Sequence, residues 1–156
     1  MVKHFRQVRP PNVQVEDKKV AFKERSLTYR QYSKGTDNKS DIIYFHGGGF
    51  VVGGLESHDD ICAEICESTG CNVFSLDYSL APEVKYPEFF LDAIRFYYFI
   101  KNPERRLILV GDSAGGTLAG FVANKVRNVS IRPEAQVLIY PDLASEISGA
   151  NKRKFY

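Results

Sequence analysis

One serine in this chain stands in a setting that could make it a nucleophile. Ser113 lies in the segment Gly-Asp-Ser-Ala-Gly-Gly, residues 111–116, directly after the apolar run 107–110. Small residues on both sides of a serine allow a tight turn from a strand into a helix, which holds the hydroxyl exposed above a sheet. Free N–H groups and the helix dipole would then favour negative charge near that hydroxyl. The alternative is a glycine-rich turn in which Ser113 only caps the helix.

A run of glycines upstream of the serine could supply the second half of such a site. Residues 46–50 read His-Gly-Gly-Gly-Phe and follow directly on the apolar run 42–45. Consecutive glycines let the backbone approach a substrate closely and point two amide protons inward, so this loop could bind a developing oxyanion. Found together with the serine segment, it favours acyl transfer over the alternative of a flexible glycine turn.

The rest of the chain must supply the elements that position these two loops. From residue 42 onward, short apolar runs typical of buried parallel strands alternate with longer amphipathic stretches. The expected strands are 42–45, 72–76, 107–110 and 137–140, and the expected helices are 57–68, 87–100 and a third after Ser113. Upstream, alternating polar and apolar positions predict one or two strands joined by the charged turn 16–19. This order predicts an α/β fold, a mostly parallel sheet with helices on both faces.

Four motifs follow one another along the chain, namely residues 46–54 (HGGGFVVGG), 77–83 (DYSLAPE), 111–116 (GDSAGG) and 140–141 (YP). In this order they resemble the motifs of the hormone-sensitive-lipase-like family of esterases and lipases. The resemblance covers residues 42–141 and implies the α/β-hydrolase fold. It also implies hydrolysis of carboxylic esters with small or medium acyl chains, by way of an acyl-enzyme, without a metal or other cofactor.

The resemblance assigns roles to individual residues. Ser113 would be the nucleophile, and the amides of Gly48, Gly49 and Ala114 would bind the oxyanion. Asp112 would point away from the reacting atoms. Structural roles are implied for His46, Gly47, Asp77, Gly111 and Gly115.

The chain also departs from the family pattern at three positions. Ser79 stands where the family often has arginine, Val84 where it often has histidine, and Glu88 where a small residue is usual. These positions belong to a loop whose role in the family is mainly structural. The departures therefore qualify the closeness of the match more than the chemistry.

A larger departure concerns the partners of the serine. In this fold the triad acid and histidine follow the serine, but the histidines of the chain, His4, His46 and His58, all precede Ser113. Asp142 and Glu146 follow the last expected strand too closely to match the family's acid. We therefore expect residues 1–156 to be a partial α/β-hydrolase domain, truncated before its last strands. Its parts would be amino-terminal strands and a loop (1–41), the motif-bearing core (42–141) and the start of an incomplete cap or connection (142–156).

Three interpretations of such a chain stay open. It could be a serine esterase or lipase that is complete only with a missing carboxy-terminal half, as a truncated gene product, a split protein or an artificial fragment would be. It could be a non-catalytic ligand-binding relative, or a non-functional remnant. An unpaired sheet edge would in each case invite self-association.

Composition excludes several other classes of function. Lysine and arginine total 21 against 19 acidic residues, for a net charge of +2, and only the cluster 152–154 is locally basic. A nucleic-acid partner is therefore not expected. No apolar run approaches the length of a membrane span, so a cytoplasmic protein acting on a small-molecule ester is expected. Three cysteines, Cys62, Cys66 and Cys71, fit reduced, buried thiols better than disulfides or a metal site.

Overall fold

A computed structural model describes residues 9–36 and 38–143 of the chain. Its elements follow the order β1 (Gln14–Phe22), β2 (Arg25–Ser33), β3 (Ser40–Phe45), α1 (Asp59–Thr69), β4 (Asn72–Asp77), α2 (Glu88–Ile100), β5 (Arg106–Asp112), α3 (Ala114–Lys125) and β6 (Ala135–Ile139). His4, Glu146, the basic cluster 152–154 and most of the expected connection 142–156 lie outside the described residues.

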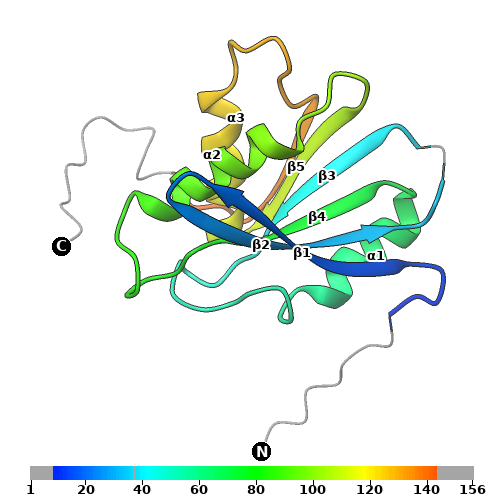
Figure 1. Cartoon of the computed structure of the whole chain (residues 1–156), viewed down its shortest axis with the longest axis horizontal. Coiled ribbons are helices and arrows are strands. Elements are labelled where there is room, and N and C mark those ends of the chain that lie inside the picture. Colours follow the sequence, from blue (N-terminus) through cyan, green and yellow to red (C-terminus); the bar gives the residue numbers. More distant parts are fainter. Residues whose placement is uncertain (1–8, 37, 144–156) are drawn as a thin grey trace, which may run out of the picture.

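The strands form one mixed sheet in the order β1-β2-β4-β3-β5-β6 (Figure 1). β3 pairs in parallel with both β4 and β5, and β5 pairs in parallel with β6. β1 and β2 form an antiparallel hairpin, and β2 joins the sheet antiparallel to β4. The prediction of a mostly parallel sheet is confirmed for the strands from residue 40 onward.

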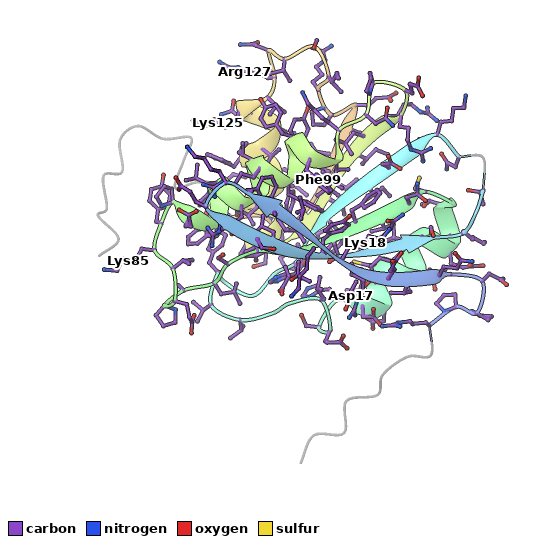
Figure 2. The ribbon with its side chains drawn as sticks, in the orientation of Figure 1. Asp17, Lys18, Lys85, Phe99, Lys125 and Arg127 are labelled. Atoms are coloured by element: carbon purple, nitrogen blue, oxygen red, sulfur yellow. The ribbon has the colours of Figure 1, made fainter. Side chains whose placement is uncertain are left out.

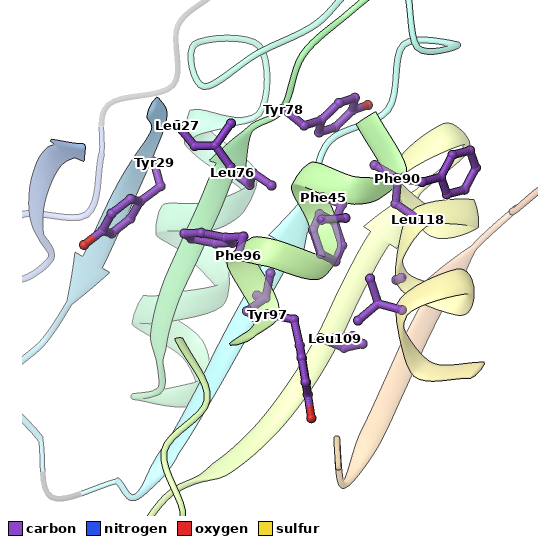
Figure 3. Close-up of a cluster of buried hydrophobic side chains, with 14 of the residues drawn as sticks. Leu27, Tyr29, Phe45, Leu76, Tyr78, Phe90, Phe96, Tyr97, Leu109 and Leu118 are labelled. Carbon is purple, nitrogen blue, oxygen red and sulfur yellow. The ribbon is translucent and has the colours of Figure 1, made fainter. Parts of the chain in front are cut away.

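Helices cover both faces of the sheet, as predicted (Figure 1). α2 and α3 pack on one face over the larger core, which includes Phe45, Leu76, Phe96, Leu109 and Leu118 (Figure 3). α1 covers the other face through a smaller core around Tyr44, Cys62, Cys66 and Val73. Because β3 is covered on both faces, all six of its residues are buried, which explains its uninterrupted apolar run.

The prediction of a charged turn at residues 16–19 is wrong. These residues lie inside β1, and the chain reverses instead at residues 23–24. β1 is an edge strand whose side chains are mostly exposed, so it can carry charges along its length. Asp17 and Lys18 (Figure 2) find partners across the hairpin, where the Arg30 guanidinium contacts Asp17 at 2.5 Å and Lys18 Nζ donates to Gln31 at 2.8 Å.

The opposite edge of the described sheet is β6. Among the described residues, β6 pairs with β5 alone, and most of its side chains are exposed. Val137 is 50% exposed and Ile139 is 39% exposed, which is unusual for apolar residues in a strand of an α/β sheet. The β6 edge of the sheet is therefore apolar, whereas the β1 edge is charged.

Candidate active site

The serine segment and the glycine loop leave the sheet side by side. β3 and β5 are neighbouring parallel strands in which Phe45 pairs with Gly111. The segments that follow, 46–50 and 112–116, therefore emerge at the same edge of the sheet, where ligands of α/β folds bind. The two segments touch, because a Cβ at Gly115 would overlap the carbonyl oxygens of Phe45 and His46. Within the serine segment, a Cβ at Gly111 would overlap the Gly115 carbonyl oxygen. Their glycines are thus required by close backbone contact.

Ser113 occupies the turn itself. It has φ 51° and ψ −121°, a backbone conformation that is strained for a residue with a side chain. The Ser113 amide donates to the Ile139 carbonyl of β6 at 2.8 Å, and its carbonyl accepts from the Thr117 amide at 3.0 Å. Its side chain is half-buried and makes no capping hydrogen bond within the described residues, so Ser113 stands at the N-cap position of α3 without capping the helix through its hydroxyl. Ala114 is the first residue of α3, where an amide has no acceptor within its own helix.

Three successive peptide groups of the glycine loop are held in fixed orientations. The His46 carbonyl accepts from the Tyr78 hydroxyl at 2.7 Å, and the Gly47 carbonyl accepts from His46 Nδ1 at 2.7 Å. The Gly48 carbonyl accepts from the amides of residues 51 and 52 at 3.1 and 3.0 Å. In a trans peptide the N–H of the next residue points opposite to the carbonyl. The bonds to the Gly47 and Gly48 carbonyls therefore also fix the directions of the Gly48 and Gly49 amides.

The Gly48 and Gly49 amides are available to a ligand. Within residues 9–36 and 38–143, neither amide donates a hydrogen bond. Gly48 has φ +126°, and a Cβ there would overlap the Val52 carbonyl oxygen, so only glycine fits this turn. Gly49 is exposed and Gly48 is half-buried.

The described histidines have other partners than Ser113. His46 is fully buried and stacks on Tyr78 with ring centroids 4.2 Å apart, and burial lowers its pKa, which keeps the imidazole neutral at pH 7. Its Nδ1 donates to the Gly47 carbonyl. His58 lies between Ser57 Oγ (2.8 Å from Nδ1) and Asp112 Oδ2 (3.3 Å from Nε2). Among the described residues, then, neither imidazole is hydrogen-bonded to Ser113.

Two further positions singled out in the sequence lie close to the site. Asp77 ends β4 beside Gly54, and a Cβ at Gly54 would lie 3.4 Å from Asp77 Oδ1, which is ordinary packing distance. The backbone of Asp142 exchanges hydrogen bonds with the Thr117 hydroxyl, at 3.0 and 3.1 Å. The Ser113 carbonyl oxygen lies 3.3 Å from the same hydroxyl and is a second possible acceptor for its proton. Thr117 thus ties the turn to the segment after β6, a link that no sequence motif indicated.

A residue that sequence reasoning missed explains two of the departures from the family pattern. The guanidinium of Arg25 contacts the Ser79 hydroxyl at 2.6 Å, the Glu88 carboxylate, and Asp92 Oδ1 at 3.0 Å. Asp92 is fully buried and also accepts from the Ser79 amide at 3.1 Å. Arg25 therefore fastens the loop 79–87 and the start of α2 to the hairpin.

The described residues hold no group of three or more histidine, cysteine, aspartate or glutamate side chains that could bind a metal ion. The three cysteines are free and buried. No helix in the described part of the chain is long and apolar enough to cross a membrane.

Comparison with known proteins agrees with this geometry. A family model for the alpha/beta hydrolase fold matches residues 42–155. The chain is 38% identical over 109 residues to an ethyl acetate hydrolase of Pseudomonas putida, a match that covers 64% of this chain and 34% of that protein. It is 35% identical over 126 residues to lipase 2 of Moraxella sp., covering 71% of this chain and 29% of that protein.

Solved structures give the same result. The thermophilic carboxylesterase EstE1, cloned from a metagenomic library, is 35% identical and superposes with a TM-score of 0.79, covering 86% of this chain and 49% of that one. An esterase of Pyrobaculum calidifontis is 34% identical with a TM-score of 0.76, covering 82% of this chain and 45% of that one. The chain thus spans about a third of the length of these curated relatives and about half of these solved structures.

Proposed function

Since the chain belongs to the hormone-sensitive-lipase-like esterases and lipases of the α/β-hydrolase fold, we propose that it carries the nucleophile and oxyanion hole of a serine carboxylesterase. In this proposal Ser113 is the nucleophile, and the amides of Gly48, Gly49 and Ala114 bind the oxyanion. The substrate is a small-molecule carboxylic ester. The domain parts proposed are 1–41, 42–141 and 142–156, with residues 42–141 as the catalytic core.

The chemistry is acyl transfer in two steps. Ser113 Oγ attacks the ester carbonyl carbon, its proton passes to a base, and the former carbonyl oxygen becomes an oxyanion held by the three amides. Collapse of this intermediate breaks the bond to the alcohol, which leaves with the proton from the base. Water then attacks the acyl-enzyme in the same way and releases the acid. We propose that the base and its acid come from residues outside this sequence, because all of its histidines precede Ser113.

The observation that carries the proposal is the adjacency of the two loops. Ser113 lies in a strained turn at the end of β5. The neighbouring strand β3 ends in a loop whose Gly48 and Gly49 amides have no acceptor within the described residues and are oriented by hydrogen bonds to the Gly47 and Gly48 carbonyls. A structural glycine turn has no need for such fixed donors beside a half-buried hydroxyl. Preorganised donors of this kind are what stabilise charge in an acyl-transfer transition state.

Joining the chain to the missing part of the fold tests the proposal. The carboxy-terminal part of one of the relatives named above would be fused directly after Pro141, so that its later strands pair with β6 and supply the acid and histidine. We expect the fusion to hydrolyse short p-nitrophenyl esters and to be labelled at Ser113 by an organophosphonate. Hydrolysis and labelling should both vanish in Ser113→Ala. Ser57→Ala should retain both, because the partners of the Ser57 hydroxyl in the described part of the chain are Gly54 and His58.

Other outcomes would contradict the proposal. A folded fusion that hydrolyses esters equally well with alanine at 113 would exclude Ser113 as the nucleophile. A folded fusion that is inert and unlabelled would favour the alternative of a non-catalytic ligand-binding protein. A cytoplasmic location is proposed as well, supported by three free thiols, which fit a reducing compartment.

A further inference from the structure

The carboxylate of Asp112 lies at the junction of three segments that are distant in the sequence. Asp112 Oδ1 accepts from the Tyr44 hydroxyl of β3 at 2.8 Å and from the Gly47 amide at 3.0 Å. Asp112 Oδ2 lies 3.3 Å from Nε2 of His58, at the start of α1. The side chain is buried, and hydrogen bonds to a buried carboxylate are stronger than those between neutral groups. Asp112 therefore binds the strand, the glycine loop and the helix together.

The contact with Gly47 is the one that bears on the proposed chemistry. Gly47 begins the loop whose next two amides are the proposed oxyanion donors. A Cβ at Gly47 would overlap Asp112 Oδ2, so the carboxylate packs directly against the backbone of the loop. Asp112 fixes the amide side of the peptide between residues 46 and 47, and the Tyr78 hydroxyl fixes its carbonyl side. The first peptide of the loop is thus held at both ends.

Asp112 is also the residue directly before Ser113. The backbone of Asp112 ends β5, and Ser113 makes the turn into α3. One side chain therefore connects the loop that would hold the oxyanion to the segment that would carry the nucleophile. Catalysis by preorganised donors requires that these two parts keep a fixed relative position, since small displacements cost large factors in rate.

We propose that Asp112 is a positioning residue, whose carboxylate sets the oxyanion loop relative to Ser113 through the Gly47 amide. This inference rests on the proposed function of Ser113 and the glycine loop. Asp112 takes no part in proton transfer, because its oxygens face Tyr44, Gly47 and His58 and make no hydrogen bond to Ser113 within the described residues.

The first test uses the chain itself and needs no activity. Amide hydrogen exchange followed by NMR should show the Gly47 amide protected in the unsubstituted chain. In Asp112→Ala its exchange should rise by about 10-fold, the scale expected for one lost hydrogen bond. Asp112→Asn keeps an oxygen acceptor for the Gly47 amide and should stay within a few-fold of the original rate. Equal exchange of the Gly47 amide in all three proteins would overturn the proposed link.

The second test uses the fusion described above and separates positioning from stability. Asp112→Ala should lower kcat per labelled site by roughly 10²-fold, with little change in KM, as expected when donors aimed at the transition state are misplaced. Asp112→Asn should recover most of that loss.

The matched control is Asp41→Ala. Asp41 is another buried carboxylate, at the opposite end of β3, where it accepts from Arg105 at 2.8 Å and Asn72 at 3.0 Å. Its loss should destabilise the protein but leave kcat per labelled site unchanged. If Asp112→Ala behaves like Asp41→Ala, the positioning role is wrong. If the unsubstituted fusion is inert, the proposed function fails, and hydrogen exchange at Gly47 still decides whether Asp112 holds the loop.

Discussion

Replacing Gly115 with alanine should destabilise the chain, whereas the same change at Gly120, in the same helix, should not. A Cβ at Gly115 would overlap the Phe45 carbonyl oxygen and lie 2.6 Å from the His46 carbonyl oxygen. Both are backbone atoms of the strand end that supports the glycine loop, so neither can rotate away. At Gly120 the nearest atoms are methyl groups of Leu143 and Leu138, at 3.1 and 3.6 Å, which belong to flexible side chains.

The two substitutions should change the free energy of unfolding in opposite directions. Alanine is favoured over glycine inside a helix by about 0.5–1 kcal/mol, so Gly120→Ala should gain up to that amount. At Gly115 a gain of about 1 kcal/mol is opposed by the cost of overpacking against fixed backbone, about 2–3 kcal/mol at the upper end of the usual range, which leaves a net loss of about 1–2 kcal/mol. With a urea dependence of about 2 kcal/mol per M, the midpoint of unfolding should fall by roughly 0.5–1 M.

Pulse proteolysis across a urea series is the suitable assay, since it reports the folded fraction at low protein concentration, where association through β6 is least. The midpoint should fall for Gly115→Ala and stay equal or rise for Gly120→Ala. If both midpoints rise, the turn does not pack against the end of β3, and the reasoning that places the two loops side by side is refuted.

Three further predictions concern the site, the thiols and the sheet edge. In the active fusion, Gly48→Val should lower turnover by about 10²–10³-fold, the effect of losing an oxyanion donor, and unchanged kcat would exclude that role. Burial raises the pKa of Cys62 to about 12 and of Cys66 to about 11. Both thiols should therefore be protonated at pH 8 and react with iodoacetamide only after unfolding. Rapid alkylation of the folded chain would contradict this, because it would show that these thiols are accessible. The exposed β6 edge should cause self-association, and Val137→Lys should shift size-exclusion profiles towards monomer, whereas a sharp monomer peak without the substitution would contradict this.

The parts of the fold that the sequence predicts are those with a local signal. The strands β3 and β5 contain short apolar runs, and in β4 such a run is interrupted only by Ser75. The hairpin was misplaced because the charges in residues 16–19 have the composition of a turn. An edge strand tolerates the same charges, and only its pairing with β2 distinguishes the two.

The two loops of the site are predictable for the same reason, since each motif is continuous in the sequence. The contacts that hold them are not. Asp112 reaches partners 54 to 68 residues away, and these contacts depend on the pairing of β3 with β5 and on where α1 begins. The spacing of residues along the chain does not indicate that these partners meet at the Asp112 carboxylate. The assignment of individual roles to Ser113, Gly48 and Gly49 stays a prediction that the fusion experiment must test.

The departures at Ser79 and Glu88 lie close together in the sequence, but the residue that contacts both of them is distant in the sequence. Read alone, serine in place of arginine removes a charge from the loop, and glutamate in place of a small residue adds one nearby. The structure places a guanidinium between them, but it comes from Arg25 on β2, 54 residues before Ser79. An arginine at 79 would bring a second guanidinium into this site. Without Arg25, the guanidinium that remains beside the Glu88 and Asp92 carboxylates, among the described residues, would be that of Arg95, at 2.8 and 3.2 Å. The two departures are therefore consistent with each other, because a single guanidinium from the hairpin contacts both the Ser79 hydroxyl and the Glu88 carboxylate.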